Sequence, residues 1–282
     1  MKKVLITGSA GFAGIHACRH FLEKGYEVFG MIRNHAHPEI GIRELSCDLT
    51  DGKEVEQIIG NVEPDMILHL AAQNHSGISW SDPLTTVSTN VMGTLNLLEA
   101  VRKKKQEAII LIAGSTLEHD PCRDTIPAHP YGLSKYMQTL AASGWGDLYR
   151  LDVRIARSSN MIGPGPSNGI CSLFARKCMK ENESFHFSNL LDKRDFVDVR
   201  DVVSAYEHIL VQGTTNHHYV IGSGRDRTLL EIARTIKTLT GSSIRITADQ
   251  FEKVETGPID ITGIRGLGWR PTIPFEVSLA DT

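Results

Sequence analysis

Tyr131 and Lys135 are the side chains of this sequence best suited to move a proton together. They are four residues apart in Tyr131-Gly-Leu-Ser-Lys135, and residues with this spacing share one face of a helix. A tyrosine phenol, with a free pKa of about 10, is a poor acid or base at neutral pH. A neighbouring ammonium can lower that pKa by ~3 units, which takes roughly 4 kcal/mol. The pair therefore predicts a proton-transfer site.

A glycine-rich turn near the start of the chain indicates a dinucleotide site. Thr7-Gly-Ser-Ala-Gly-Phe-Ala-Gly14 follows an apolar run and precedes a helical pattern. In this setting Gly8 allows a tight turn, Gly11 lets backbone N–H groups approach a pyrophosphate, and Gly14 lets the helix pack on the strand. The phosphates would lie at the N-terminus of the helix. The expected contacts in the turn are Gly8, Ala10, Gly11, Phe12 and Ala13.

Alternating apolar strands and helices must position these two segments. The runs at 4–7, 28–32, 67–70, 109–113 and 153–156 predict strands, and the patterns at 12–23, 55–59, 87–102 and 133–148 predict helices. Continuous apolar strands that alternate with helices imply a parallel sheet covered on both faces. From residue 163 onward the elements become shorter and the loops more polar, apart from a predicted helix at 198–210.

Composition and charge restrict the class of protein. The 282 residues are 41% hydrophobic and 22% charged, as in an ordinary soluble globular protein. A net charge of −3 argues against a nucleic-acid partner. No apolar run reaches the eighteen or so residues that span a membrane, and a core strand begins directly after Met1-Lys2-Lys3, so we expect neither a membrane partner nor a signal peptide.

Cysteines and histidines give no sign of a disulfide framework or a metal site. The five cysteines are odd in number and scattered, without a Cys-x-x-Cys pair, which is typical of free thiols in a cytoplasmic protein. No carboxylate or thiol cluster accompanies the histidine pairs at 35/37 and 217/218, so exposed loop histidines are expected and no metal ligand is assigned.

Further motifs, all in the same order along the chain, resemble those of the extended short-chain dehydrogenase/reductase family. Beside the two segments above they are Leu68-His-Leu-Ala-Ala-Gln73, Asn90-Val-Met-Gly-Thr94, Gly114-Ser-Thr-Leu-Glu118, Arg157-Ser-Ser-Asn-Met-Ile-Gly-Pro-Gly-Pro166, Arg194-Asp-Phe-Val-Asp-Val-Arg-Asp201 and Tyr219-Val-Ile-Gly-Ser-Gly224. The resemblance implies a Rossmann-type doubly wound parallel α/β sheet with a smaller C-terminal substrate lobe. It places an NADP-binding domain at 1–160, a returning segment near 194–212 and a mainly substrate-binding lobe at 161–282.

The end of the second predicted strand indicates which cofactor is bound. An acidic residue there would bind the ribose hydroxyls of NAD, whereas an arginine accommodates the extra phosphate of NADP. The sequence has Arg33 and no acid, which favours NADP(H) over NAD(H), with an exposed loop arginine as the alternative. Asp48 resembles the family aspartate near the adenine, and its alternative role is a helix cap. Further expected cofactor contacts are Leu49, Leu70, Ala71 and Ala72, together with Tyr131 and Lys135.

The resemblance assigns catalytic roles to four residues. Tyr131 would be the acid–base group, and Lys135 would bind the nicotinamide ribose. Thr116 would hydrogen-bond the reacting oxygen, whereas the adjacent Ser115 is expected to point the opposite way along the strand. Glu118 matches an acid–base glutamate of nucleotide-sugar 4,6-dehydratases, but a glutamate at this position also occurs in GDP-sugar reductases.

Substrate motifs favour a nucleotide-diphosphate sugar. Asn160, Arg194 and the Gly-Pro-Gly-Pro turn match diphosphate positions of the family, and the segment that ends at Ser76 resembles the GDP-mannose 4,6-dehydratase and GDP-4-keto-6-deoxymannose reductase branch. The short chain favours the NADP(H)-dependent reductase, with a 4,6-dehydratase or 4-epimerase that recycles its cofactor as the alternative. A non-catalytic NADP-binding regulator is the second alternative.

The resemblance also implies a homodimer. Family members often pair the helix after Asn90 with the helix that carries Tyr131, and here the apolar positions for this pairing are Val91, Leu95, Leu98, Tyr136 and Leu140. Relatives usually continue a last helix beyond the position of Thr282, so the substrate lobe is expected to be less complete than usual.

Overall fold

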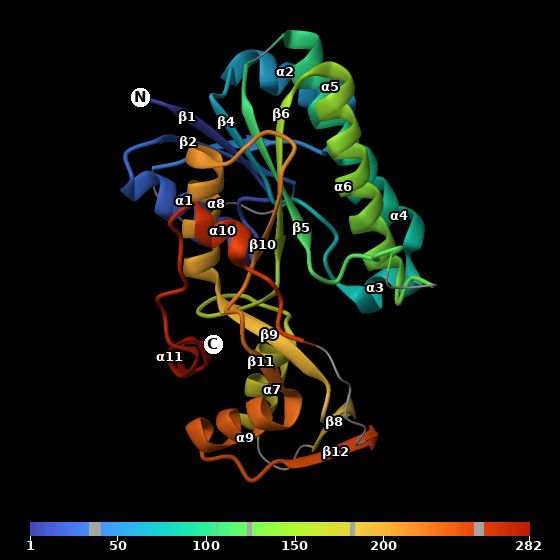
Figure 1. Ribbon diagram of the computed structural model, residues 1–282, viewed down its shortest axis with the longest axis vertical. Helices are drawn as coiled ribbons and strands as arrows, with labels where there is room; N and C mark the ends of the chain where they lie inside the picture. Colours follow the sequence, from blue (N-terminus) through green and yellow to red (C-terminus); the bar gives the residue numbers. More distant parts are fainter. Residues whose placement is uncertain (34–40, 106, 123–125, 181–183, 251–256) are drawn as a thin grey trace. The chain divides into compact units, whose positions relative to one another are not determined.

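The computed structural model describes residues 1–33, 41–105, 107–122, 126–180, 184–250 and 257–282 (Figure 1). The chain divides into two compact units. The first is Met1–Arg157 with Val203–Tyr219, and the second is Ser158–Val202 with Val220–Thr282. The segment that returns to the first unit begins at Val203, nine residues after the expected start at 194, because the strand Lys193–Asp198 pairs inside the second unit.

The first unit is an α/β structure built on a seven-stranded sheet of order β10-β6-β5-β4-β1-β2-β3, which confirms the predicted fold class. The pairs β1–β2, β1–β4, β2–β3 and β4–β5 are parallel. The strands are β1 (Lys3–Thr7), β2 (Glu27–Ile32), β3 (Arg43–Ser46), β4 (Met66–His69), β5 (Ile109–Ser115), β6 (Asp152–Ser158) and β10 (His218–Ile221).

Helices cover both faces of this sheet. Figure 1 shows α1 and α8 on one side and α2, α5 and α6 on the other. The central strands are therefore apolar on both faces, and Val4, Leu5 and Ile6 are fully buried. The helices are α1 (Phe12–Glu23), α2 (Gly52–Val62), α3 (Ser76–Ser81), α4 (Pro83–Val87), the π-helical η1 (Ser88–Met92), α5 (Gly93–Lys104), α6 (Pro130–Tyr149) and α8 (Val199–Gln212), which begins in the second unit.

The strand β3 and the helix α3 were not predicted from the sequence. Three of the four residues of β3 are exposed, so this edge strand has no apolar run to reveal it. Helix α3 has only six residues, too few to show a helical period. The pattern at 87–102 is correctly helical, but a π-helical turn connects α4 to α5 within it.

The second unit has its own apolar core between short sheets and helices. Its sheets have the orders β11-β9-β7 and β12-β8. Buried core residues include Phe174, Phe187, Phe196 and Ile232. Its elements are β7 (Asn160–Ile162), α7 (Ile170–Cys178), β8 (Ser184–Asn189), β9 (Lys193–Asp198), β11 (Asp226–Thr228), α9 (Leu229–Thr240), β12 (Arg245–Gln250), α10 (Thr262–Gly266) and α11 (Phe275–Ala280).

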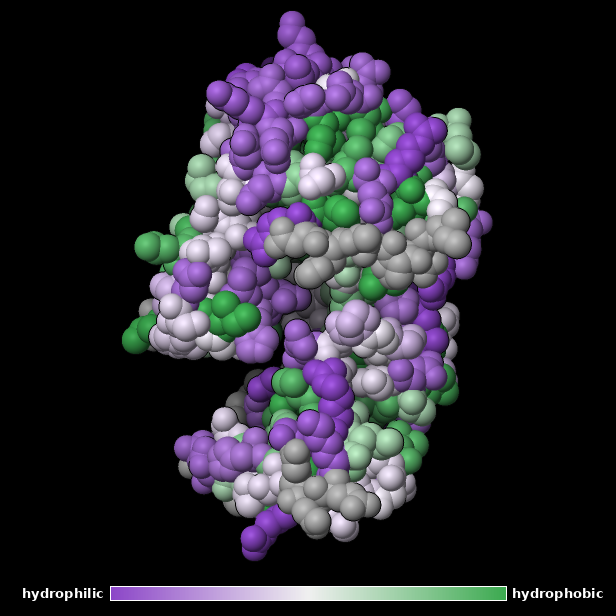
Figure 2. Space-filling view, turned by 180° about the vertical axis from the view of Figure 1, so that it is seen from behind, coloured by the Kyte–Doolittle hydropathy of each residue, from purple (hydrophilic) through white to green (hydrophobic). Residues whose placement is uncertain are grey.

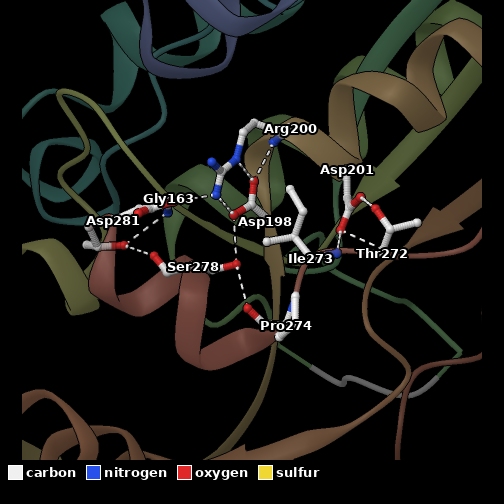
Figure 3. A network of polar contacts seen from close by, with 10 residues as sticks. Gly163, Asp198, Arg200, Asp201, Thr272, Ile273, Pro274, Ser278 and Asp281 are labelled. Carbon is white, nitrogen blue, oxygen red and sulfur yellow. Dashed lines mark hydrogen bonds and ion pairs between the residues drawn. The ribbon is translucent and has the colours of Figure 1, made fainter. Parts of the chain in front are cut away.

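Two carboxylates at the start of α8 hold the last segment of the second unit (Figure 3). Asp198 accepts hydrogen bonds from the guanidinium of Arg200 and from the Ser278 hydroxyl at 2.7 Å. Asp201 accepts bonds from the backbone N–H groups of Thr272 and Ile273 and from the Thr272 hydroxyl. Helix α11 is thereby attached to the end of β9. Within the described ranges, no helix is long and apolar enough to cross a bilayer.

Candidate active site

The glycine-rich turn connects β1 to α1 and passes close to β4. Gly8 has φ of +68°, and a Cβ on it would lie 2.9 Å from the backbone of Ala71. A Cβ on Gly14 would lie 2.2 Å from the carbonyl oxygen of Gly8, so the first turn of α1 packs on the loop itself. Gly11 is the N-cap residue and provides no side-chain hydrogen bond to the helix. This arrangement suits a bound phosphate, because helix N–H groups and the positive end of the dipole favour an anion.

The carboxyl end of β4 lies beside this turn. The N–H of Leu70 donates to the Thr7 carbonyl at 3.3 Å, and the N–H of Ala71 donates to the Thr7 hydroxyl at 3.1 Å. Leu70, Ala71 and the following Ala72 are half-buried. The structure therefore brings these three predicted cofactor contacts next to the predicted phosphate turn.

Arg33 and Asp48 follow the neighbouring strands β2 and β3. Arg33 is exposed, whereas Asp48 accepts bonds from the Thr50 N–H at 2.9 Å and hydroxyl at 2.8 Å. These bonds, with a contribution from the charge of Arg33, lower the pKa of Asp48. The helix-cap alternative for Asp48 is wrong, since Asp51 is the N-cap of α2. Leu49, between them, is buried.

Tyr131 and Lys135 lie in the first turns of α6, and both are buried. The helix begins at Pro130, and the Nδ1 atom of His129 accepts the N–H of Gly132 at 2.7 Å. The Lys135 ammonium donates to the Ala113 carbonyl of β5 at 2.5 Å. Burial lowers the pKa of Lys135 to about 8. The helical spacing therefore brings both side chains into the core beneath the end of β5.

The predicted lowering of the tyrosine pKa is not found. Burial raises the pKa of Tyr131 to about 12, a hydrogen bond with the Ser115 side chain opposes this rise, and the charge of Glu118 adds to it. The Lys135 ammonium donates to the Ala113 carbonyl and to the Gln138 side chain. Desolvation of the phenolate therefore outweighs the effect expected from the lysine.

Ser115 is a site residue that the sequence motifs did not predict. Its hydroxyl bonds the Tyr131 side chain, and it also accepts the N–H of Leu117 at 3.1 Å. The expectation that Ser115 points away is wrong because β5 ends at Ser115 and the chain turns there, so strict strand alternation no longer applies. Thr116 is the next residue and is half-buried.

Glu118 is bonded inside the first unit. Its carboxylate accepts the Ser115 N–H at 2.8 Å and the Thr139 hydroxyl at 3.1 Å, and it lies 3.0 Å from the Nε of Arg157. The Glu118 side chain is only 4% exposed. Burial raises its pKa, and the charge of Arg157 is the largest opposing effect. These contacts hold Glu118 against the end of β5.

A buried row of polar side chains, which was not predicted from the sequence, connects the glycine-rich turn to Lys135. The Thr7 hydroxyl lies 2.9 Å from His69 Nδ1, and His69 Nε2 lies 2.8 Å from the Thr94 hydroxyl. Gln138 donates to Thr94 at 2.7 Å and accepts from Lys135 at 2.6 Å. Only the family motifs containing His69 and Thr94 pointed towards this row.

His69 should make the protein sensitive to acid. Burial, with a smaller contribution from the charge of Lys135, lowers its pKa from 6.5 to about 3. The unfolded chain therefore binds a proton that the folded chain rejects, so stability falls as pH drops below 6.5. From pH 7 to 5 this one group should cost about 2 kcal/mol.

Urea unfolding at pH 7 and 5 would measure this cost in the wild type and in His69→Gln, which cannot titrate. The stability lost between pH 7 and pH 5 is compared between the two proteins, because His218 in β10, with a pKa lowered to about 4, also contributes to the loss in both. Equal loss of stability in the two proteins would contradict the prediction. The expectation of an exposed loop is wrong for His218, because it lies in β10 with a half-buried side chain that contacts the Ser143 hydroxyl at 3.0 Å. His35 and His37 lie outside the described residues.

The predicted substrate residues are divided between the two units. Ser76 is exposed at the start of α3 in the first unit. In the second unit, Asn160 donates to the Asp195 carbonyl at 3.0 Å, and Arg194 pairs with Asp192 at 2.8 Å. The carboxylate of Asp195 accepts four hydrogen bonds. They come from the Ser159 hydroxyl, from both the N–H and the hydroxyl of Ser223, and from the N–H of Arg225, and they hold this part of β9.

Comparisons with known proteins find enzymes of nucleotide-sugar metabolism along nearly the whole chain. It is 29% identical to a putative UDP-glucose 4-epimerase of Methanocaldococcus jannaschii, over 97% of this chain and 94% of that protein. It is 27% identical to the GDP-6-deoxy-D-mannose reductase of Pseudomonas aeruginosa, over 99% and 95%. The fold is similar to that of UDP-glucose 4-epimerase from Thermotoga maritima, with a TM-score of 0.89, 25% identity and coverage of 99% and 97%.

The family described as the NAD dependent epimerase/dehydratase family matches residues 4–222. This range contains the glycine turn, the β4 end, Ser115, Tyr131 and Lys135. The resemblance to extended short-chain dehydrogenases/reductases is confirmed, and the relatives are enzymes that epimerise, dehydrate or reduce nucleotide sugars. The chain therefore belongs to the NAD dependent epimerase/dehydratase family.

Proposed function

We propose that this protein is an NADP(H)-dependent oxidoreductase that reduces the 4-keto group of a nucleotide-diphosphate sugar, with a GDP-linked 4-keto-6-deoxy sugar favoured. The observation that carries the proposal is the position of Tyr131, which lies on the same helix as Lys135 and whose side chain hydrogen-bonds Ser115 at the end of β5. Relatives that include a GDP-6-deoxy-D-mannose reductase of nearly equal length support it.

The chain's own residues account for binding and proton transfer in such a reaction. The bound dinucleotide would supply a hydride to the carbonyl carbon. The glycine turn would hold its pyrophosphate, and Lys135 would contact the nicotinamide ribose. Tyr131 would give its proton to the carbonyl oxygen as the hydride arrives, and Thr116 would hydrogen-bond that oxygen. In this proposal the first unit holds the cofactor, and Asn160 and Arg194 of the second unit hold the diphosphate of the substrate.

Glu118 makes a 4,6-dehydratase the weaker alternative. A dehydratase would need this glutamate as a free acid–base group. Here one carboxylate oxygen accepts the Ser115 N–H, and the other accepts the Thr139 hydroxyl and forms an ion pair with Arg157. We therefore assign Glu118 a positioning role at the end of β5.

A 4-epimerase that recycles its cofactor is the second candidate. The similarity to the Methanocaldococcus and Thermotoga UDP-glucose 4-epimerases supports it. The two candidates differ in redox balance, because a reductase consumes one NADPH for each sugar and an epimerase consumes none.

The experiment offers the purified protein GDP-, UDP- and dTDP-linked 4-keto sugars with NADPH, and separately UDP-glucose with NAD⁺. We expect stoichiometric loss of NADPH absorbance with a 4-keto substrate. Interconversion of UDP-glucose and UDP-galactose without net redox change would overturn the reductase in favour of the epimerase. Saturable NADPH binding without turnover of any sugar would point to a regulator.

Arg33 should set the cofactor preference. It is exposed at the end of β2, where an arginine can bind the extra phosphate of NADP. Arg33→Ala should weaken NADPH binding by roughly ten- to a hundredfold, since a charged hydrogen bond contributes about 1.5–3 kcal/mol, and should leave NADH binding almost unchanged. Fluorescence titrations of both cofactors test this. Equal or tighter binding of NADH than of NADPH by the wild type would contradict it.

We also propose that two copies of this chain form a homodimer through one face of α6. Figure 2 shows apolar residues at the surface on the side where Figure 1 places α3, α4 and α6. Leu140 and Leu148 are 58% and 73% exposed. Val91 and Leu98, two of the positions named from the sequence, are buried in the first unit and cannot pair across a dimer.

Light scattering at micromolar concentration should therefore give twice the chain mass of 31.1 kDa. Leu140→Glu should shift it towards the monomer, because a charge would be buried at the contact. The matched control is Leu239→Glu on α9, where the side chain is 49% exposed. A wild-type monomer mass would rule out the dimer.

A cytoplasmic location also belongs to this proposal, and the five free cysteines agree with it.

A further inference from the structure

We propose that Gln138 is a positioning residue that holds the ammonium of Lys135 and that His69 and Thr94 fix Gln138 in turn. The inference rests on the proposed function, which gives Lys135 its contact with the cofactor ribose. Gln138 is on the same face of α6, three residues after Lys135, and is 1% exposed. A polar side chain so deeply buried is stable only if its hydrogen bonds are satisfied.

The donors and acceptors allow one orientation of the Gln138 amide. An ammonium only donates, so the Gln138 oxygen must face Lys135 at 2.6 Å. The amide nitrogen then donates to the Thr94 hydroxyl at 2.7 Å. Thr94 uses its single proton in a bond to the Asn90 carbonyl at 2.7 Å. Thr94 therefore acts only as an acceptor towards Gln138 and His69.

This direction determines the state of His69. Its Nε2 must carry the proton that Thr94 accepts, and its Nδ1 must accept the Thr7 hydroxyl proton. The Thr7 oxygen can then accept the N–H of Ala71. Every bond in the row is satisfied with a neutral imidazole, and the lowered pKa of His69 agrees with that state.

The row limits the hydrogen bonds that the Lys135 ammonium can make to other partners. Lys135 gives one proton to the Ala113 carbonyl and one to Gln138, which leaves a single N–H for other partners. The charge of Glu118 raises the pKa of both Lys135 and Tyr131, and the charge of Lys135 in turn lowers the pKa of His69. The row also reaches the backbone of Ala71, which lies against Gly8 of the phosphate turn. One rigid set of bonds thus locates both predicted ends of the cofactor site.

The test follows the Lys135 ammonium directly, without any substrate. Protein labelled with ¹⁵N at lysine and histidine should show a slowly exchanging ammonium signal that disappears in Lys135→Met. Gln138→Met keeps the volume but removes the acceptor, and it should abolish or shift this signal. Gln138→Glu restores an oxygen acceptor and should recover it. The matched control is Ser143→Ala, which lies on the same helix as Gln138 and removes a hydroxyl contact with His218 of β10.

NADPH titration provides the second measurement. Gln138→Met should weaken binding roughly tenfold, Gln138→Glu should bind within a few-fold of the wild type, and Ser143→Ala should be unchanged. Histidine spectra should show His69 as the Nε2–H tautomer without titration between pH 5.5 and 8. An ammonium signal unaffected by Gln138→Met, or the other tautomer, would overturn the inference. Absence of NADPH and NADH binding in the wild type would instead refute the proposed function, and the spectra would still decide the role of Gln138.

Discussion

Tyr131→Phe should lower turnover by about 10²- to 10⁴-fold, the usual contribution of general acid–base catalysis. The substitution keeps the ring in its buried position and removes only the hydroxyl that contacts Ser115. Folding and NADPH affinity should therefore change little. Steady-state turnover and NADPH affinity are the two measurements. Near-normal turnover in Tyr131→Phe would eliminate the phenol as the acid.

Lys135→Met should have a broader effect than Tyr131→Phe. It removes the ammonium expected at the ribose and leaves the Ala113 carbonyl and the Gln138 oxygen without their donor. Leaving buried acceptors unsatisfied costs about 1–3 kcal/mol each, so stability and cofactor affinity should fall together with turnover. The double variant should be little slower than the worse single variant, because both residues serve one proton transfer. Additive losses would indicate two separate steps.

Gly14→Ala should damage both stability and cofactor binding. The added Cβ would lie 2.2 Å from the Gly8 carbonyl and 2.6 Å from that of Ser9, both backbone atoms that cannot move without distorting the turn. Overpacking of this kind typically costs about 1–3 kcal/mol, and the N–H groups of α1 would leave their positions around the pyrophosphate. Urea unfolding and NADPH titration measure the two effects.

Gly144→Ala provides the matched control on α6. A Cβ there meets nothing within 4 Å, so the substitution should stabilise the helix by up to ~1 kcal/mol and leave NADPH affinity unchanged. A Gly14→Ala protein as stable as the wild type, with normal NADPH affinity, would show that the close approach at this position is unimportant.

Much of the first unit follows from local sequence patterns. The predicted helix at 12–23 coincides with α1, and the five predicted strands each overlap an observed strand. These elements could be predicted because each is buried on both faces and therefore apolar throughout, or has a regular helical period. The edge strand β3 lacks both signals, since most of its side chains are exposed.

The sequence by itself determined the groups that can carry chemistry. The Tyr131–Lys135 spacing and the glycine turn depend on helix periodicity and on backbone freedom, which are properties of a few neighbouring residues. The tertiary structure alone decided how these groups are used. It brings the Ser115 hydroxyl into a hydrogen bond with Tyr131 and Glu118 into an ion pair with Arg157. It also lets Lys135 donate a hydrogen bond to the carbonyl of Ala113, which lies 22 residues earlier in the chain. Such contacts arise because parallel strands bring distant segments to one edge of the sheet, and no local spacing encodes that meeting. Burial there raises the pKa of Tyr131, because charge is costly away from water.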